Sequence, residues 1–329
     1  MIEVSAEATR HLGLDLGATN LKWAVVASDG GSWVTLAREQ VRTNVVADAA
    51  AVPDNVVAQL VQVAGDVVGS WGPIATVGIG VPGLYDPATG RTRFLVNVPG
   101  PWDGQPVAGP VGDALGLPTI LINDARAFGL AELRLGAGRG ASTMIGFTLG
   151  TGVGGVVAVD GQVIQGHDGT AGELGHQTIE PDGPWCGCGN RGCVEAFARA
   201  DQIAALCGTA TAEEAVTRAR AGDTRAIDGL AQVGRYLGIG IANTIAVLTP
   251  DRVVLGGGVS AAGDLLLDPI RQELRRRVRT TALDEVELVT AELGTWAGAI
   301  GAAVYGAEVV TGRAASMGSP GAAPAAVAR

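Results

Sequence analysis

The chain has 329 residues, of which 47% are hydrophobic and 17% are charged, a composition typical of compact globular proteins and not of disordered ones. At roughly 150 residues per domain, this length suggests two domains. The formal net charge is −10, and the one arginine-rich stretch, residues 271–279, has the spacing of a solvated helix face, so we expect no nucleic-acid partner. No apolar run is long enough to span a membrane and the first ten residues lack a signal-peptide core, so we expect a cytoplasmic protein that binds no membrane.

Hydrophobic periodicity predicts strands that alternate with helices, the pattern of an α/β protein. In the first part of the chain we expect strands at 11–17, 22–28, 32–41, 75–83 and 118–124, and helices at 47–69 and 125–138. In the second part we expect strands at 143–150, 154–161, 251–258 and 286–290, an irregular Gly/Cys-rich segment up to about residue 193, and helices within 194–248 and at 265–278 and 296–310. From Thr311 onward the Ala/Gly/Ser/Pro composition predicts a flexible tail.

A short internal similarity suggests a duplication. The segments HLGLDLGATN and IGFTLGTGVGG, roughly 135 residues apart, are each a strand that breaks into a Gly/Thr-rich turn. Two such halves would form a duplicated α/β unit with a cleft between them. Because the similarity is short, a chance match stays open as the alternative.

The same two turns are candidates for phosphate binding. Glycines let backbone N–H groups approach a phosphate closely, and a threonine hydroxyl adds a donor, as in Asp15–Asn20 and Leu149–Gly155. Asp15, at the end of its strand, is a suitable ligand for hydrated Mg²⁺. Neither turn matches the P-loop pattern, and either alone could be an ordinary β-turn. Together with Gly256–Gly258 after a third strand, they favour a nucleotide site.

Asn123 and Asp124 end a predicted strand and open a helix. Both residue types are favoured helix N-caps, which is the structural interpretation. A carboxylate at the end of such a strand is also where a general base can stand, and Asp124 could accept the proton of a hydroxyl that attacks phosphorus. The local sequence alone favours the cap and leaves the general base open as the alternative.

One histidine and three closely spaced cysteines form the strongest local pattern. His176, Cys186, Cys188 and Cys193 fit a closed tetrahedral Zn²⁺ site with no open position for catalysis. Chance clustering of thiols or a redox role of the CGC sequence is the alternative. The carboxylates of Glu173 and Glu195 flank this set, and rigidly held carboxylates are good acceptors for sugar hydroxyls.

With these motifs in view, the chain resembles the ROK family of sugar kinases, and within it the bacterial ATP-dependent glucokinases. The resemblance extends from about Leu12 to Ala307 and rests on DLGATN, VPG, IND, LGTGVGG, AGELGH, CGCGNRGCVE and LGGGVS. The cysteine segment after GELGH is the most specific of these motifs.

The resemblance implies an actin-like ATPase (ribonuclease H-like) fold with two α/β domains and an interdomain cleft. The smaller domain would span residues 1–123 and include the last helix, about 297–310. The larger domain, 124–296, would carry the zinc-binding segment, followed by the tail at 311–329.

The resemblance also implies a role for each motif residue. Asp124 would be the catalytic base that deprotonates the sugar 6-hydroxyl. The sugar would bind to Asn97, Asn123, Asp124, Glu173, His176 and Glu195. The ATP and its Mg²⁺ would bind to Asp15, Gly17, Thr19, Asn20, Gly150, Thr151, Gly152, Gly257 and Gly258. The structural Zn²⁺ would be held by His176, Cys186, Cys188 and Cys193.

The implied function is transfer of the γ-phosphoryl group of ATP to the 6-hydroxyl of a hexose, with glucose as the expected substrate. N-acetylmannosamine, N-acetylglucosamine, an aminodeoxyhexose or fructose are alternative substrates, and polyphosphate is an alternative donor. A ROK repressor would need a helix-turn-helix module, and about eleven residues before Leu12 are too few for one. A sugar-binding ROK protein without catalysis is the alternative of another class. The family habit also implies a homodimer or homotetramer.

Overall fold

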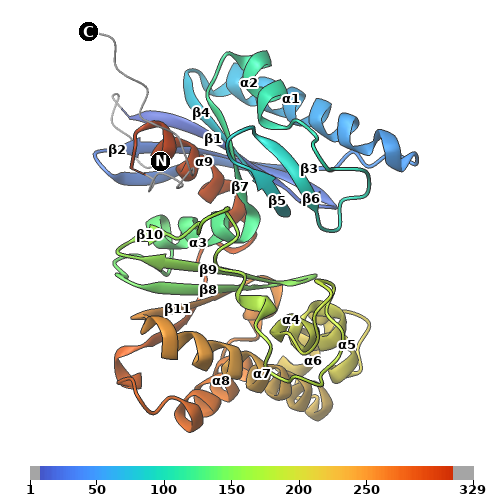
Figure 1. The fold of residues 1–329 in the computed structure, drawn as a ribbon, viewed down its shortest axis with the longest axis vertical. Helices are drawn as coiled ribbons and strands as arrows, with labels where there is room; N and C mark the ends of the chain where they lie inside the picture. The colour runs from blue at the N-terminus through green and yellow to red at the C-terminus, as the bar shows by residue number, and fades with distance from the viewer. Residues whose placement is uncertain (1–7, 314–329) are drawn as a thin grey trace. The chain divides into compact units, whose positions relative to one another are not determined.

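The computed structural model describes residues 8–313, which form two compact units (Figure 1). Unit 1 comprises the described residues up to Ala127, the segment Ile164–Ala171 and the described residues from Ala302 on. Unit 2 comprises Phe128–Val163 and Gly172–Gly301. The chain therefore passes between the units four times, twice inside a helix. Most of the predicted tail, residues 314–329, lies outside the described residues.

Unit 1 is built on a five-stranded mixed sheet in the order β3-β2-β1-β4-β7. Strands β1, β2 and β3 pair antiparallel, whereas β4 pairs parallel with both β1 and β7. The strands are β1 (Thr9–Leu16), β2 (Asn20–Asp29), β3 (Ser32–Arg42), β4 (Ile74–Val81) and β7 (Thr119–Asn123). A separate hairpin consists of β5 (Gly83–Asp86) and β6 (Arg91–Leu95).

Helices cover both faces of this sheet. On one face, α1 (Val52–Trp71, preceded by the short 3₁₀ turn η1, Ala49–Ala51) and α2 (Ala108–Leu115) share a core with Val77 and Ile79 of β4. On the other face, α9 (Ala297–Val310) approaches β4 so closely that a Cβ at Gly78 would lie 1.8 Å from the Ala302 carbonyl oxygen. Because successive strand residues point to opposite faces, Gly78 between two core residues leaves room for the helix backbone.

Unit 2 contains a second five-stranded mixed sheet in the order β10-β9-β8-β11-β12. Its strands are β8 (Met144–Leu149), β9 (Val153–Val159), β10 (Gln162–Val163), β11 (Arg252–Gly256) and β12 (Glu287–Thr290). Its α-helices are α4 (Val194–Ala198), α5 (Ala200–Cys207), α6 (Ala212–Arg220), α7 (Thr224–Leu248) and α8 (Asp264–Arg277), while α3 (Asp124–Leu135) begins in unit 1 and continues here. Short 3₁₀ turns complete it: η2 (Leu174–His176), η3 (Gly258–Ala262), η4 (Leu283–Glu285) and η5 (Gly294–Trp296).

The two sheets have the same topology, which confirms the predicted duplication. In each, three strands pair antiparallel in sequence and two further strands add parallel on the other side of the first strand. Strand β8 therefore corresponds to β1, and β11 corresponds to β4. As a consequence, the two Gly/Thr-rich turns follow equivalent strands and occupy equivalent positions in their sheets.

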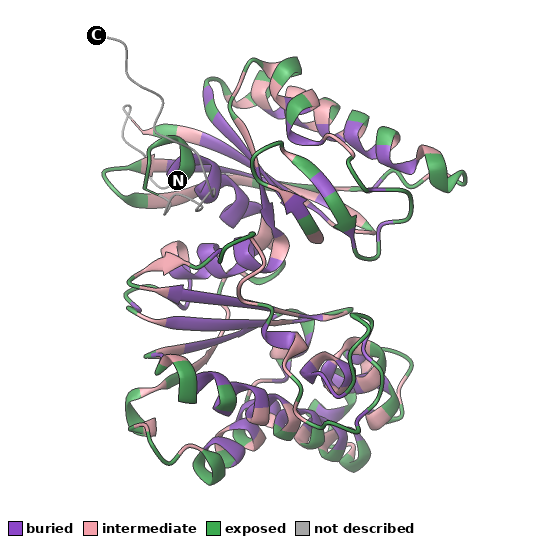
Figure 2. Ribbon diagram, viewed as in Figure 1, coloured by how far each residue is buried: buried purple, intermediate pink, exposed green. Residues whose placement is uncertain are grey.

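The central strands of each sheet are buried (Figure 2), as parallel strands covered on both faces require. In unit 2, α7 provides the largest helical surface of the core through Leu230, Val233, Leu237, Ile241 and Ile245. These residues recur at spacings of three and four, so they lie on one face of the helix.

The α/β class and the predicted strand and helix pattern are confirmed, but helix α2 and the hairpin β5–β6 were not predicted. Helix α2 has the sequence AGPVGDAL, in which two glycines and a proline weaken any helical signal. In the hairpin β5–β6, Leu84 and Phe94 are paired across the strands but exposed, so the hairpin lacks the alternation of a half-buried strand. The irregular segment before residue 193 contains only the two-residue strand β10 and η2 among its described residues. In the described range, no helix has the length and apolar character needed to cross a bilayer.

Burial of His11 in unit 1 makes the stability of the protein depend on pH. Its buried ring lies 2.8 Å from the Thr76 hydroxyl (Nδ1 to Oγ1) and 3.1 Å from the Ser28 hydroxyl (Nε2 to Oγ), and burial lowers its pKa from 6.5 to about 4. Between those two pH values the unfolded chain binds a proton that the folded chain does not, so stability is lost as the pH falls from about 6.5 to about 4.

We expect His11→Gln to remove this dependence. From pH 7 to pH 4 the wild type should lose about 3 kcal/mol of unfolding free energy relative to the variant. Denaturant unfolding of both proteins across this range measures the difference, and acid-sensitive groups common to both proteins cancel. Parallel stability curves would contradict a neutral buried His11.

Candidate functional site

The first Gly/Thr-rich turn connects β1 to β2 and is stabilised by a hydrogen bond within the turn and by two hydrogen bonds from Thr43. The Gly17 N–H donates to the Asn20 carbonyl at 3.1 Å, and a Cβ at Gly17 would lie 2.8 Å from that oxygen. Thr43 binds the turn twice, through its hydroxyl to the Gly17 carbonyl at 2.7 Å and its N–H to the Thr19 carbonyl at 2.9 Å. The sequence did not single out Thr43, because it lies beyond the predicted strands and matches no motif.

Asp15 precedes this turn and is largely buried, with 16% of its side chain exposed. Burial raises the pKa of its carboxyl, and Lys22, whose Nζ lies 3.9 Å from Oδ2, acts in the opposite direction. A carboxylate in this environment is stabilised by additional positive charge. The Asp15 carboxylate is therefore suited to binding a divalent cation.

At the end of β7, Asn123 and Asp124 form different hydrogen bonds with the start of helix α3. The Asn123 Oδ1 accepts the N–H groups of Ala125 (3.1 Å) and Arg126 (3.2 Å), which is the bonding pattern of an N-cap. The Asn123 Nδ2 donates to the Gly83 carbonyl at 3.2 Å. Asp124 is the first residue of α3, and its Oδ1 accepts the adjacent Ala125 N–H at 2.8 Å. The structure thus gives the cap to Asn123, so helix α3 does not require Asp124 as its cap.

Arg126, two residues beyond Asp124, is another residue that the sequence did not single out. Its side chain is 1% exposed, and Nε and one terminal nitrogen donate to the Ala171 carbonyl at 2.9 and 2.6 Å. This contact fixes the segment that leads into GELGH, within unit 1. Burial of an arginine is the signal, and it is visible only in three dimensions.

The strand register places the unit 1 candidates at one edge of the sheet. Asp15 is paired with Gly80, and Val81 with Asn123, so the parallel strands β1, β4 and β7 end side by side at spacings of about 4.8 Å. Asn97, the remaining unit 1 candidate, is exposed and has a φ of 64°, a conformation that asparagine tolerates better than most residues. It follows Val96, whose N–H donates to the Pro82 carbonyl at 2.7 Å.

In unit 2, the second turn and the glycines after β11 lie together. The Gly150 N–H donates to the Gly152 carbonyl at 3.0 Å, which closes the turn around Thr151. A Cβ at Gly257, whose φ is 84°, would lie 2.0 Å from the Leu149 carbonyl oxygen, so only glycine fits there. Gly258 follows at the start of η3.

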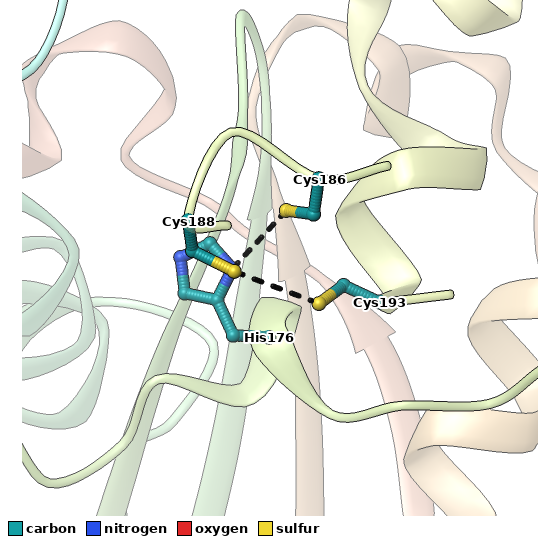
Figure 3. A group of neighbouring side chains, drawn as sticks. All are labelled: His176, Cys186, Cys188 and Cys193. Carbon is teal, nitrogen blue, oxygen red and sulfur yellow. Dashed lines mark hydrogen bonds between the residues drawn. The ribbon is translucent and has the colours of Figure 1, made fainter. Parts of the chain in front are cut away.

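His176, Cys186, Cys188 and Cys193 form one cluster (Figure 3), in which the ligand atoms all lie within 4.8 Å of one another. The Cys186 sulfur lies 3.6 Å from His176 Nδ1, and the Cys188 and Cys193 sulfurs are 3.8 Å apart. These thiols form no disulfide in the described part of the chain. His176 comes from η2, Cys186 and Cys188 from the irregular loop, and Cys193 from the N-cap of α4.

The cluster fits zinc. Tetrahedral Zn²⁺ with Zn–S bonds of ~2.3 Å and a Zn–N bond of ~2.0 Å separates two sulfurs by ~3.8 Å, and a sulfur from a nitrogen by ~3.5 Å. The separation between Cys188 and Cys193 and that between Cys186 and His176 match these two values. His176 faces the sulfurs with Nδ1, which leaves Nε2 as the second ring nitrogen.

The pKa values of the three thiols are shifted in different directions. Burial raises the pKa of Cys186 and Cys193. Burial acts to raise the pKa of Cys188 as well, but hydrogen bonds from the Asn190 backbone and from the neighbouring thiols outweigh it and lower that pKa. Three thiolates this close together would repel one another unless a cation compensated their charge.

The two flanking glutamates occupy different environments. Glu173 is exposed and precedes η2, and its carbonyl accepts the His176 N–H at 3.0 Å. Glu195 lies in the first turn of α4, where Oε2 accepts the Val153 N–H at 2.9 Å and Oε1 lies 3.3 Å from the Cys186 sulfur. Glu195 therefore contacts both the His/Cys cluster and Val153, the first residue after the turn Gly150–Gly152.

The candidates consequently fall into two sets, one on each unit. The unit 1 set lies around the ends of β1 and β7 and consists of Asp15, Gly17, Thr19, Asn20, Asn97, Asn123 and Asp124. The unit 2 set surrounds the second turn and the cluster and consists of Gly150, Thr151, Gly152, Glu173, His176, Cys186, Cys188, Cys193, Glu195, Gly257 and Gly258.

We expect Cys188→Ser to lose the metal. The hydroxyl is a poor replacement for a thiolate ligand, and structural zinc contributes folding energy on the order of 10 kcal/mol in small domains. Metal analysis should find one zinc per wild-type chain and well under one in the variant, with a lower melting temperature. Cys207→Ser, at a buried cysteine outside the cluster, is the matched control and should keep its zinc. Equal zinc in wild type and Cys188→Ser would contradict this ligand set.

Comparisons with known proteins agree with this geometry. The model of the ROK family matches residues 11–308. The glucokinase of Halalkalibacterium halodurans is 33% identical over 88% of this chain and 93% of its own length, and that of Thermotoga maritima is 34% identical over 89% and 95%. A solved ROK glucokinase from Streptomyces griseus, in complex with glucose and AMPPNP, is 30% identical, covers 91% of this chain and 99% of its own, and superimposes with a TM-score of 0.75.

The relatives also include regulators. The xylose repressor of Bacillus subtilis is 30% identical over 70% of this chain and 60% of its own length. The expected actin-like ATPase fold is confirmed by the solved relatives and by the duplicated sheet topology. From the extent of these matches, the chain belongs to the ROK family.

Proposed function

We propose that the protein is a sugar kinase that transfers the γ-phosphoryl group of ATP to the 6-hydroxyl of a hexose, most simply glucose. The observation that carries the proposal is that the N-cap at the end of β7 is Asn123. Asn123 caps helix α3, and Asp124 stands beside it with a carboxylate that the helix does not need as a cap. A general base requires such a carboxylate at a fixed backbone position.

In this mechanism Asp124 accepts the proton of the 6-hydroxyl as that oxygen attacks the γ-phosphorus. A bond forms between the sugar oxygen and phosphorus, the bond from phosphorus to the β–γ bridging oxygen breaks, and its electron pair leaves with ADP. Phosphoryl transfer needs little covalent chemistry from the protein, and positioning and charge neutralisation supply most of the acceleration. General base catalysis contributes about 10²- to 10⁴-fold.

The turns Asp15–Asn20 and Gly150–Gly152 and the pair Gly257–Gly258 would bind the nucleotide. Backbone N–H groups in Gly/Thr-rich turns are suited to phosphate oxygens, and the turns are held by hydrogen bonds before any ligand arrives. Asp15 would hold Mg²⁺, which neutralises phosphate charge when bound. The zinc would have a structural role, because all four ligand positions are supplied by the protein.

Glucose is the proposed substrate because the similar proteins named above are glucokinases. Asn97, Asn123, Glu173, His176 and Glu195 would bind its hydroxyls. The two glutamates offer acceptors for hydroxyl donors, and the second ring nitrogen of His176, which carries the proton when Nδ1 binds zinc, offers an N–H donor to a hydroxyl oxygen. One hydroxyl or acetamido contact separates glucose from N-acetylmannosamine, N-acetylglucosamine, an aminodeoxyhexose or fructose, so all of these belong in the test.

The experiment is an ADP-release assay with Mg-ATP across those sugars, with Asp124→Asn compared to wild type. Asparagine retains hydrogen bonding but is not a base, so we expect turnover on one sugar to fall at least about 10²-fold while sugar affinity stays near normal. Asp113→Asn, an exposed carboxylate on α2 of the same unit, is the matched control and should behave as wild type.

Each other result has a distinct meaning. Retained turnover in Asp124→Asn would remove Asp124 from the mechanism. Turnover with polyphosphate but not ATP would reassign the donor. Sugar binding without turnover on any member of the panel would contradict the kinase and favour a binding protein, as the similarity to xylose repressors allows.

A further inference from the structure

The chain that leaves the metal cluster returns at once to the second turn and holds it at both ends. Two residues after the ligand Cys193, the Glu195 carboxylate accepts the Val153 N–H at 2.9 Å. Five residues further, at the start of α5, the Ala200 N–H donates to the Gly150 carbonyl at 2.9 Å. Gly150 is the first residue of the turn Gly150–Gly152 and Val153 directly follows it. Both ends of the turn are therefore bonded to the segment that follows the cluster.

The contact with Glu195 is close enough to restrict the turn itself. A Cβ at Gly152 would lie 2.5 Å from Glu195 Oε2. Glycine at this position therefore allows the carboxylate to reach the backbone. The second oxygen of the same carboxylate lies 3.3 Å from the Cys186 sulfur, so one side chain touches a metal ligand and the turn.

The segment that carries the ligand His176 also contacts Val153, on its carbonyl side. Gly175, directly before the ligand His176, packs so closely on β9 that a Cβ would lie 1.9 Å from the Val153 carbonyl oxygen. Cys193 and His176 are joined by backbone contacts as well, since the Val194 N–H donates to the Gln177 carbonyl at 3.0 Å. Val153 is thus held by its N–H from one ligand-bearing segment and by its carbonyl face from the other.

We propose that the metal centre is a clamp on the second turn, through which metal occupancy controls the affinity for the nucleotide phosphates. Glu195 and the Ala200 N–H are its positioning groups. The inference rests on the proposed function, in which this turn binds ATP, and it assigns the metal an effect on nucleotide binding in addition to any effect on the sugar.

Ala200 separates this proposal from a role confined to the sugar. It is the first residue of α5, where proline is tolerated because the N–H has no partner inside the helix. Arg199 before it is extended, with φ −73° and ψ 159°, as a residue preceding proline should be. Ala200→Pro therefore removes the bond to Gly150 and keeps the helix, the metal ligands and every proposed sugar contact.

The first test measures binding of a nonhydrolysable Mg-ATP analogue without sugar, by calorimetry. We expect Ala200→Pro to weaken this binding about 3- to 10-fold, the effect of one lost hydrogen bond, with sugar affinity and zinc content unchanged. Thr224→Pro, at the equivalent first position of α7 and exposed, is the matched control and should leave nucleotide affinity unchanged. Unchanged nucleotide affinity in Ala200→Pro would overturn the proposal.

The second test does not depend on activity. Hydrogen–deuterium exchange of the peptide containing Val153 should accelerate when zinc is removed from the wild type by a chelator, and zinc readdition should restore protection. Exchange confined to residues 176–193, with residues 150–153 still protected, would contradict the clamp. A wild type that binds no Mg-nucleotide would instead reject the proposed function, while the exchange result would still decide whether the metal holds the turn.

Discussion

The convergence of one imidazole and three thiols is the constraint on which the functional part of unit 2 depends. The segment from Gly172 to Cys193 is rich in glycine and polar residues. Leu174 and Ile179 anchor it to the main core of unit 2, and around the thiols the local core is only Cys186, Cys193 and Ala196. Hydrophobic burial of this size cannot order some twenty irregular residues against their conformational entropy. In the proposed function, metal coordination would supply the missing free energy and would hold Cys193, two residues before Glu195, in place.

Duplication explains why two similar turns occur in one chain. Both follow the first strand of a sheet with the same topology, yet each is held in its own way. Thr43, at the end of β3, fixes the first turn from within unit 1. The second turn is fixed by Glu195 and Ala200, which lie beyond the metal loop. The two halves therefore share a sheet topology, and among the described residues the His/Cys cluster lies in unit 2.

Much of this account was predictable from the sequence, because strand and helix periodicity and the spacing of the four metal ligands are local signals. The hairpin β5–β6 and helix α2 were missed, since exposed apolar pairs and a helix with two glycines give no clear period. The sequence also left the cap at Asn123 or Asp124 undecided, because both residue types are good caps. The bond from Val153 to Glu195 joins residues 42 positions apart, and no pattern along the chain reports it.

The most direct test of the central claim is the chemical identity of the product. Nuclear magnetic resonance of the mixture formed from the wild type, Mg-ATP and ¹³C-glucose should show phosphorus coupled to carbon 6, with ADP formed in equal amount. This result would establish both the donor and the attacking hydroxyl that the placement of Asp124 requires. Phosphate on another carbon, or ADP and inorganic phosphate with unmodified sugar, would contradict a 6-kinase.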